Sequence, residues 1–335
     1  MWRSWFRIGT AILLSTISVQ AQVGRPRGTP AGINEQIAAL SAADPVARGF
    51  AACFLGSMGR RAAAAVPPLA RLLSDATSID PVACRGDEFW AISVHGRMKS
   101  SPGFEAARAL GAIGERALDS LLQAIRSDNR DARRHAAHAL GMIRDERSLT
   151  ALITATKDPE ATVRTEAAAG LGRQRDARGL DALTRLARDA NSDVRQYATR
   201  ALGQLGQGGS LESLIANASD PDERVRWEAV TALGRVRDRG EGADAVKTLI
   251  AALRDSSPWV RERAARALGR FRDERAVAPL ATLLKDSDPE VREEVVAALG
   301  RFGQPQATDS LIAALKDPDA GVRERAAQAL SKGRR

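Results

Sequence analysis

Hydrophobic and polar positions along most of the chain follow a pattern that repeats every 31 residues. Each repeat unit begins with a stretch in which large aliphatic residues recur at helical spacing, such as Leu280 and Leu284. A second stretch follows a Val-Arg pair and carries a stripe of small residues, such as Ala264 and Ala265. Apolar residues three and four positions apart predict an amphipathic helix. The pattern therefore predicts two short helices in every unit.

The Arg of the Val-Arg pair marks the register of the repeat. It stands at 164, 195, 226, 261, 292 and 323, at intervals of 31, 31, 35, 31 and 31 residues, and the longer interval contains a four-residue insertion near Gly240. Arg133 extends the series upstream by one unit, and looser matches end at Gly111 and Gly56. The chain therefore contains about nine units.

Units this short cannot bury their apolar faces alone, so they must stack on one another. We expect an all-α fold, a right-handed superhelical solenoid over residues 33–333, after a short linker at 22–32. Asp145, Asp176 and Asp273 are the expected N-caps of first helices. The Gly residues at 141, 172, 203, 234, 269 and 300 are expected to end or loosen the second helices through a left-handed conformation.

On these residues the chain resembles a HEAT-repeat protein, of the short-repeat kind named after phycobilin lyases. Members of this wider family act as scaffolds, as bilin lyases or as iron-dependent deoxyhypusine hydroxylases. The resemblance therefore implies a binding surface before it implies chemistry. The paired His-Glu motifs expected of a deoxyhypusine hydroxylase are missing. Export, argued below, would separate a bilin lyase from its cytoplasmic cofactor and substrate.

An Asp lies six residues before each repeated Arg, in the predicted turn between the two helices of the unit. The two residue types can form charge-assisted hydrogen bonds that satisfy turn backbone groups and join adjacent units. A row of phosphate-binding Arg is the alternative interpretation. The ladder residues are Asp158, Arg164, Asp189, Arg195, Asp220, Arg226, Asp255, Arg261, Asp286, Arg292, Asp317 and Arg323.

Variable positions of the repeat indicate where a ligand would bind. Counting from the repeated Arg, positions +3, +4, +6 and +7 are small or apolar, so we expect +1, +2, +5 and +9 to point outward. The resemblance implies that this side of the second helices is concave. Aromatic residues beside Arg are typical anchors of protein interfaces, although the rings here can also simply cover the groove. The predicted partner-binding residues are Tyr197, Arg200, Trp227, Glu228, Arg235, Arg263 and Arg270.

One segment, residues 76–101, departs from the period and is predicted to be an inserted loop. It contains Cys84, and Cys53 lies at an outward +5 position of the first unit. These are the two Cys of the chain. We expect a disulfide between them in an exported protein, with two free thiols as the alternative.

The first 21 residues have the parts of a secretory signal peptide. Arg3 and Arg7 precede an apolar stretch from Ile8 to Val19, and Ala21 is the expected cleavage site. The apolar stretch is shorter than the roughly 20 residues needed to span a bilayer, and no second one follows. We therefore expect a bacterial protein exported to the periplasm or cell envelope, with no transmembrane segment after cleavage.

Composition excludes several kinds of chemistry. With three His and two Cys, the chain has few ligands for a metal, and His135 and His138 lack a third partner by pattern and are expected to face solvent. The formal net charge is +9, but Glu166, Glu228 and Glu294 interrupt the basic positions, so we do not expect nucleic-acid binding. Motifs of hydrolases and phosphate-binding loops are absent from the sequence, and we expect no cofactor.

These observations together favour a monomeric, exported, non-catalytic scaffold that binds a protein partner on its concave face. One alternative is a lyase-like or oxidoreductase-like HEAT protein that binds a small ligand or cofactor in the groove. Another is an adaptor for an anionic polymer or lipid headgroups.

Overall fold

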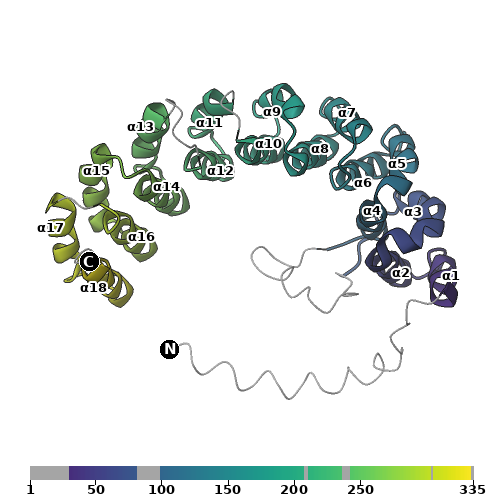
Figure 1. Cartoon of the computed structure of the whole chain (residues 1–335), viewed down its shortest axis with the longest axis horizontal. Coiled ribbons are helices and arrows are strands. Elements are labelled where there is room, and N and C mark those ends of the chain that lie inside the picture. Colours follow the sequence, from purple (N-terminus) through teal and green to yellow (C-terminus); the bar gives the residue numbers. More distant parts are fainter. Residues whose placement is uncertain (1–29, 81–98, 207–209, 236–241, 303–304, 333–335) are drawn as a thin grey trace, which may run out of the picture.

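A computed structural model describes residues 30–80, 99–206, 210–235, 242–302 and 305–332. Within these ranges the chain forms nine consecutive helix pairs arranged as an open arc (Figure 1). The outer helices are α1 (Pro30–Ala39), α3 (Val66–Leu72), α5 (Leu118–Ala124), α7 (Glu146–Ala155), α9 (Leu180–Leu186), α11 (Leu211–Asn217), α13 (Gly242–Ala252), α15 (Val277–Thr282) and α17 (Pro305–Ala314). The expected all-helical solenoid of about nine units is confirmed.

The second helix of each unit lies on the concave side of the arc, as the sequence predicts (Figure 1). These inner helices are α2 (Pro45–Met58), α4 (Pro102–Ile113), α6 (Arg130–Leu140), α8 (Ala161–Gln174), α10 (Ser192–Leu205), α12 (Glu223–Leu233), α14 (Pro258–Phe271), α16 (Pro289–Leu299) and α18 (Ala320–Lys332). Short 3₁₀ turns precede several outer helices, at Gly59–Ala65, Gly114–Ala117, Ala177–Gly179 and Glu274–Ala276, and another, Leu283–Lys285, follows α15.

Capping Asp residues start the outer helices at the predicted positions. The side chains of Asp145, Asp176 and Asp273 each accept a hydrogen bond from the backbone N–H two residues later. Each Asp has an extended backbone, as an N-cap requires. These three predictions are confirmed.

The repeated Gly residues have a different role from the one expected. None of them has a positive φ, and Gly172, Gly203 and Gly269 lie inside inner helices. These positions have no room for a side chain, because the next inner helix passes close by. A Cβ on Gly203 would lie 2.5 Å from Cβ of Ala232 in the following unit. Instead, Arg175 and Arg272 adopt the left-handed conformation that ends α8 and α14. Close packing between units therefore explains the repeated Gly. Gly141, Gly234 and Gly300 do end α6, α12 and α16 as expected, but in a right-handed conformation.

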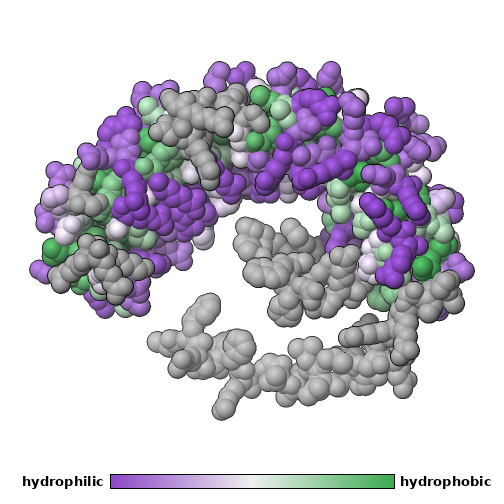
Figure 2. Space-filling model, viewed as in Figure 1, coloured by the Kyte–Doolittle hydropathy of each residue, from purple (hydrophilic) through white to green (hydrophobic). Residues whose placement is uncertain are grey.

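A single apolar core of Leu, Ala and Val runs the length of the solenoid between the two layers of helices. Small side chains fill the contacts between neighbouring inner helices, so those helices lie close together. Polar side chains cover most of the visible surface, including the concave side (Figure 2). Such a core positions successive inner helices as a rigid row, and their variable side chains form the concave surface.

The base of the inserted loop is part of the described structure. Ile79 and Ser100 form an antiparallel bridge with two backbone hydrogen bonds of 2.9 Å, which joins the two ends of the insertion. Residues 81–98, with Cys84, lie outside the described residues, so the Cys53–Cys84 disulfide stays a prediction. Cys53 itself, on α2, is 7% exposed. The predicted signal peptide also lies outside, and α1 begins at Pro30, within the predicted linker.

Candidate protein-binding surface

The repeated Arg and Asp form one hydrogen-bonded ladder along the turns of the solenoid. Nε and Nη2 of Arg195 donate to Oδ2 and Oδ1 of Asp220 in the next unit, at 2.7 and 2.9 Å respectively. Nη1 donates to the carbonyl oxygens of Asp189 and Ala190 in its own turn, at 3.0 and 3.1 Å. The same arrangement joins Arg133 to Asp158, Arg164 to Asp189, Arg226 to Asp255, Arg261 to Asp286 and Arg292 to Asp317.

Both partners of the ladder are largely buried, since side-chain exposure is 15% for Arg195 and 6% for Asp220. The carboxylates also accept hydrogen bonds from the turn backbone, as Asp189 does from the N–H of Asn191. Burial alone would raise the pKa of Asp189, but the hydrogen bonds from Arg164 and Asn191 outweigh it and lower that pKa. Four of the five N–H groups of Arg195 donate to protein acceptors. The paired Arg residues therefore join adjacent units, as the ladder interpretation predicts, whereas Arg323 at the end of the series is exposed and, among the described residues, donates only to the carbonyl oxygens of Asp317 and Pro318 in its own turn.

A second set of ion pairs crosses the concave surface, and the sequence analysis missed it. The basic residue at +5 of one unit contacts the Glu at +2 of the next. His138 Nδ1 lies 3.0 Å from Glu166 Oε2, Arg200 Nε lies 2.8 Å from Glu228 Oε1, and Arg266 Nη2 lies 2.8 Å from Glu294 Oε2. These pairs occur at every second junction only. The signal is visible in the aligned repeats, because position +2 is Glu in alternate units: Glu166, Glu228 and Glu294.

Guanidinium groups also stack on aromatic rings, once across the junction between α12 and α14 and once within α10. The guanidinium carbon of Arg263 lies 4.7 Å from the ring centroid of Trp227, and that of Arg200 lies 5.0 Å from the ring of Tyr197. Both rings also pack against the core and are partly buried. Burial lowers the pKa of Arg263, which is consistent with a desolvated cation held on the Trp227 ring. These two stacked pairs lie on α10 and across α12 and α14, which are inner helices of the solenoid.

Two expected outward side chains prove to be buried. Glu228 is 4% exposed because Arg200 covers it, so it supports the surface and does not present a free carboxylate. His135 is 1% exposed, and its Nδ1 lies 2.7 Å from the carbonyl oxygen of Leu73. His135 reaches the segment before the inserted loop, which is the reason that it does not face solvent.

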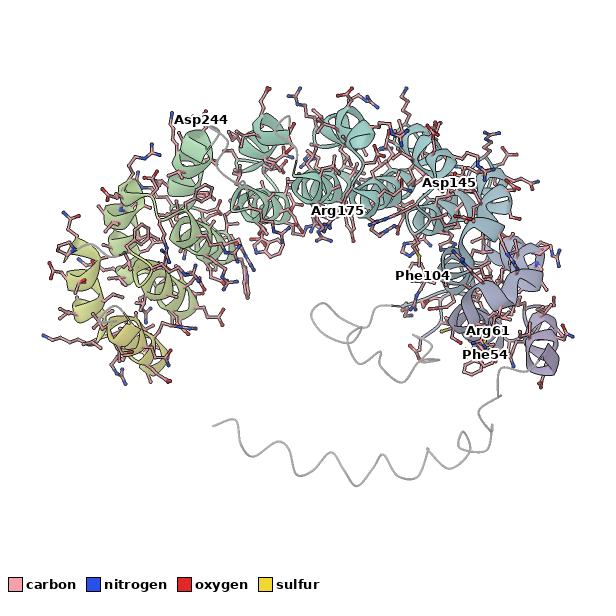
Figure 3. The ribbon with its side chains drawn as sticks, in the orientation of Figure 1. Phe54, Arg61, Phe104, Asp145, Arg175 and Asp244 are labelled. Carbon is pink, nitrogen blue, oxygen red and sulfur yellow. The ribbon has the colours of Figure 1, made fainter. Side chains whose placement is uncertain are left out.

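Position +9 supplies exposed Arg residues at the C-terminal ends of inner helices. Arg173, Arg235, Arg270 and Arg301 are all exposed. The side chain of Arg173 lies over Gly141 of the preceding unit, and that of Arg301 lies over Gly269. Because Gly has no side chain, it leaves room for these two Arg side chains to pack against the preceding inner helix. Side chains of the inner helices project into the hollow of the arc, whereas those of outer helices, such as Asp244, project away from it (Figure 3).

The stacked helix pairs are the architecture that a match to a repeat-protein family also indicates. The model of HEAT repeats matches residues 104–172, 180–247 and 246–331, which is more than half of the chain. The chain belongs to the HEAT-repeat family. No curated protein matches its sequence.

Solved structures of other solenoids share the HEAT fold. The E. coli protein YibA is 21% identical with a TM-score of 0.59, over 80% of this chain and 92% of that one. An engineered protein is also 21% identical, with a TM-score of 0.52, over 90% of this chain and 89% of its own. Kap95p, solved with RanGDP, is 16% identical with a TM-score of 0.57, over 91% of this chain and 45% of that one. At these identities the likeness shows the fold alone.

The described part of this HEAT solenoid also bears on membrane, metal and small-ligand sites. No described helix is long and apolar enough to cross a membrane. Among the same residues, no three His, Cys, Asp or Glu side chains come together as metal ligands. Two open hollows lie between neighbouring outer helices, one of them lined by Leu122, Arg147 and Thr154. The concave face remains the surface on which the predicted partner-binding residues gather.

Proposed function

We propose that this HEAT protein is an interaction scaffold that binds a protein partner on the concave face of α10, α12 and α14. The observation that carries the proposal is the stacked surface of Tyr197, Arg200, Trp227 and Arg263, held in place by the buried Glu228. Aromatic and Arg side chains with few remaining conformations lose little entropy when they bind, which is why they anchor interfaces.

The stiffness of the support strengthens this proposal. The Arg–Asp ladder and the Gly contacts fix each inner helix against the next, so the side chains above them are positioned before a partner arrives. Preorganised surfaces bind more tightly than surfaces that must first become ordered. A rigid arc with a patterned inner face therefore suits the display of several contacts to one extended partner.

Site-specific photo-cross-linking from the concave face tests the proposal. Tyr197 is replaced by a photoreactive phenylalanine analogue in the producing cell, and Thr150, exposed on the outer helix α7, is replaced in a matched control. We expect a discrete protein adduct from position 197 and none of the same mass from position 150. Adducts of equal yield from both positions, or none from 197 while the protein is folded, would reject a concave binding site.

We also propose that the scaffold is exported after cleavage at Ala21 and that Cys53 and Cys84 form a disulfide. The basic and apolar start of the chain supports export, and an oxidising compartment supports the disulfide. Protein purified from the envelope fraction should begin at Gln22, and both Cys should react with a maleimide only after reduction. A chain that retains Met1, or thiols that react without reduction, would contradict these expectations.

A further inference from the structure

Charge on the concave face is unevenly paired. Several of its acidic groups are engaged by neighbouring bases: Glu166 by His138, Glu262 and Glu294 by Arg266, and Glu293 by Arg325. Glu324 on α18 is an exposed exception that accepts a hydrogen bond from Gln328. On the convex side some exposed Arg residues are paired, for example Arg147 with Asp119. The surplus charge of the concave side therefore comes from Arg residues that no carboxylate neutralises.

Three of these Arg residues stand in consecutive units. Arg235, Arg270 and Arg301 occupy position +9 after α12, in α14 and after α16, and all three are exposed. Among the described residues, none of them has an ion-pair partner within 4.0 Å, in contrast to the paired ladder Arg. We refer to Arg235, Arg270 and Arg301 as the Arg row. Arg270 lies on α14 together with Arg263, which stacks on Trp227.

The spacing of the Arg row indicates what it would bind. Packed helices lie about 8–10 Å apart, so the row offers one guanidinium per unit at about that interval. A peptide in the polyproline II conformation has three residues per turn and rises about 3.1 Å per residue, so every third side chain lies on one face at intervals of about 9 Å. Carboxylates at every third residue of an extended peptide would therefore meet successive Arg of the row.

A nucleic acid fits this surface less well. Phosphates follow one another at about 3.4 Å per strand along the helix axis, far more densely than one Arg per unit. An acidic peptide with a carboxylate at every third residue matches the spacing of the row.

We propose that the Arg row recognises an extended acidic segment of the protein partner, with carboxylates at every third residue. The inference rests on the proposed scaffold function and adds the chemistry of its partner. Bidentate pairing of guanidinium with carboxylate fixes the position of the segment along the arc. The stacked surface then selects among acidic segments through their other side chains.

The test uses a fluorescein-labelled peptide of about five Glu-Ser-Pro triplets, which favours the polyproline II conformation. Fluorescence anisotropy measures its affinity for the mature chain at low ionic strength. A second peptide of the same composition carries all its Glu in one block, and a third replaces Glu by Lys. We expect no binding of the Lys peptide and up to about fivefold tighter binding of the triplet peptide than of the block peptide, because five adjacent Glu reach at most two Arg of the row and each exposed charge pair contributes about 0.2–1 kcal/mol.

Two triple variants with the same change of net charge locate the site. Arg235→Gln, Arg270→Gln and Arg301→Gln should weaken triplet binding about tenfold. Arg147→Gln, Arg178→Gln and Arg275→Gln remove exposed Arg that already pair with Asp or Glu on the outer side, and should change binding less than about twofold. Circular dichroism confirms that both variants fold.

Several outcomes would overturn the inference. Equal binding of the triplet and block peptides, or equal loss in both triple variants, would show attraction to net charge alone. Tighter binding of single-stranded DNA or polyphosphate, lost in the Arg-row variant, would identify a polyanion site instead. The cross-linking experiment at Tyr197 is independent of this outcome. If the adduct forms at position 197 but the peptide does not bind, only the acidic-segment inference is rejected. If the peptide binds but no adduct forms, the proposed binding surface at Tyr197 is rejected.

Discussion

Arg200 on α10 and Glu228 on α12 form an ion pair in which both Nε and Nη2 donate to the same carboxylate oxygen. The glutamate is 4% exposed, whereas the Arg200 side chain is 40% exposed and also covers the ring of Tyr197. Arg200 therefore connects the buried Glu228 of the next unit to the exposed concave surface. Because Arg200 contacts both Glu228 on α12 and the ring of Tyr197, a shift of α12 would also shift the side chains on α10.

We predict that removing Arg200 costs more stability than removing both partners. Arg200→Met leaves the buried carboxylate of Glu228 without its guanidinium and should lower the free energy of unfolding by about 3 kcal/mol. Adding Glu228→Gln should recover part of this loss, because the uncompensated charge is gone. Urea unfolding of the two single variants and the double variant measures the coupling. Additive losses would mean that the two side chains do not interact.

The Arg–Asp ladder should make the solenoid sensitive to acid. Burial opposes ionisation of Asp286, but the hydrogen bonds from Arg261 and the N–H of Asp288 lower its pKa below the ordinary value. A carboxyl with a lowered folded pKa adds stability above its unfolded pKa of about 3.9 and loses it as the pH falls further. Asp286→Asn should therefore be less stable than the parent at pH 7, and this difference should shrink below about pH 4. Urea unfolding midpoints of the parent and of Asp286→Asn at several pH values measure this difference. A stability difference that does not change with pH would contradict the prediction.

An exposed ion pair provides the matched control for the ladder. Arg147 and Asp119 lie 3.0 Å apart, but their side chains are 58% and 90% exposed. Solvent screens such a pair, so Asp119→Asn should change the free energy of unfolding by less than about 1 kcal/mol at any of these pH values.

The fold could be predicted from the sequence because it rests on repetition. Six units repeat the same Val-Arg start and the same small-residue stripe, and looser copies precede them, so the aligned units give one clear pattern. The ladder Asp could also be found, since it recurs at a fixed distance from Arg. Repetition at one position indicates which residues join units.

The concave surface was harder to predict because its pairs join residues of different units. Glu228 occupies an outward position by helical periodicity, yet Arg200 of the neighbouring unit buries it. The repeated Gly203 was misassigned for the same reason: its smallness serves the Ala232 contact in the next unit, which a pattern within one helix does not contain. Interactions across units require the stacking geometry as well as the period.

Gly203 gives a direct test of this packing. A Cβ there would lie 2.5 Å from Cβ of Ala232, so α10 and α12 would have to separate. Gly203→Ala should lower the free energy of unfolding by about 1–3 kcal/mol, although Ala is favoured over Gly within a helix by about 1 kcal/mol. Gly179→Ala is the control, since its Cβ would meet Leu171 at an ordinary 3.4 Å. If Gly203→Ala proved as stable as the parent, the close packing of inner helices would not constrain this position.

His135 should add a second pH dependence at a higher pH. Its Nδ1 must donate to the carbonyl oxygen of Leu73, which leaves Nε2 to accept a hydrogen bond from Nη2 of Arg134 at 2.9 Å. Burial, and the charge of Arg134, lower the pKa of the ring and keep it neutral. The unfolded chain therefore binds a proton more readily than the folded one, so stability falls as the pH drops below the unfolded value of about 6.5.

His135→Asn isolates this contribution, because the Asn amide can replace the Nδ1 donor toward Leu73 but does not titrate. We expect the stability advantage of the parent over the variant to be larger at pH 7.5 than at pH 5.5, by urea unfolding, because only the parent loses stability when its unfolded ring is protonated. Proton NMR of the parent should show the His135 ring titrating below pH 6.5. A ring that titrates above that value would mean that His135 is stabilised as a cation, and the base of the inserted loop would then tighten in acid.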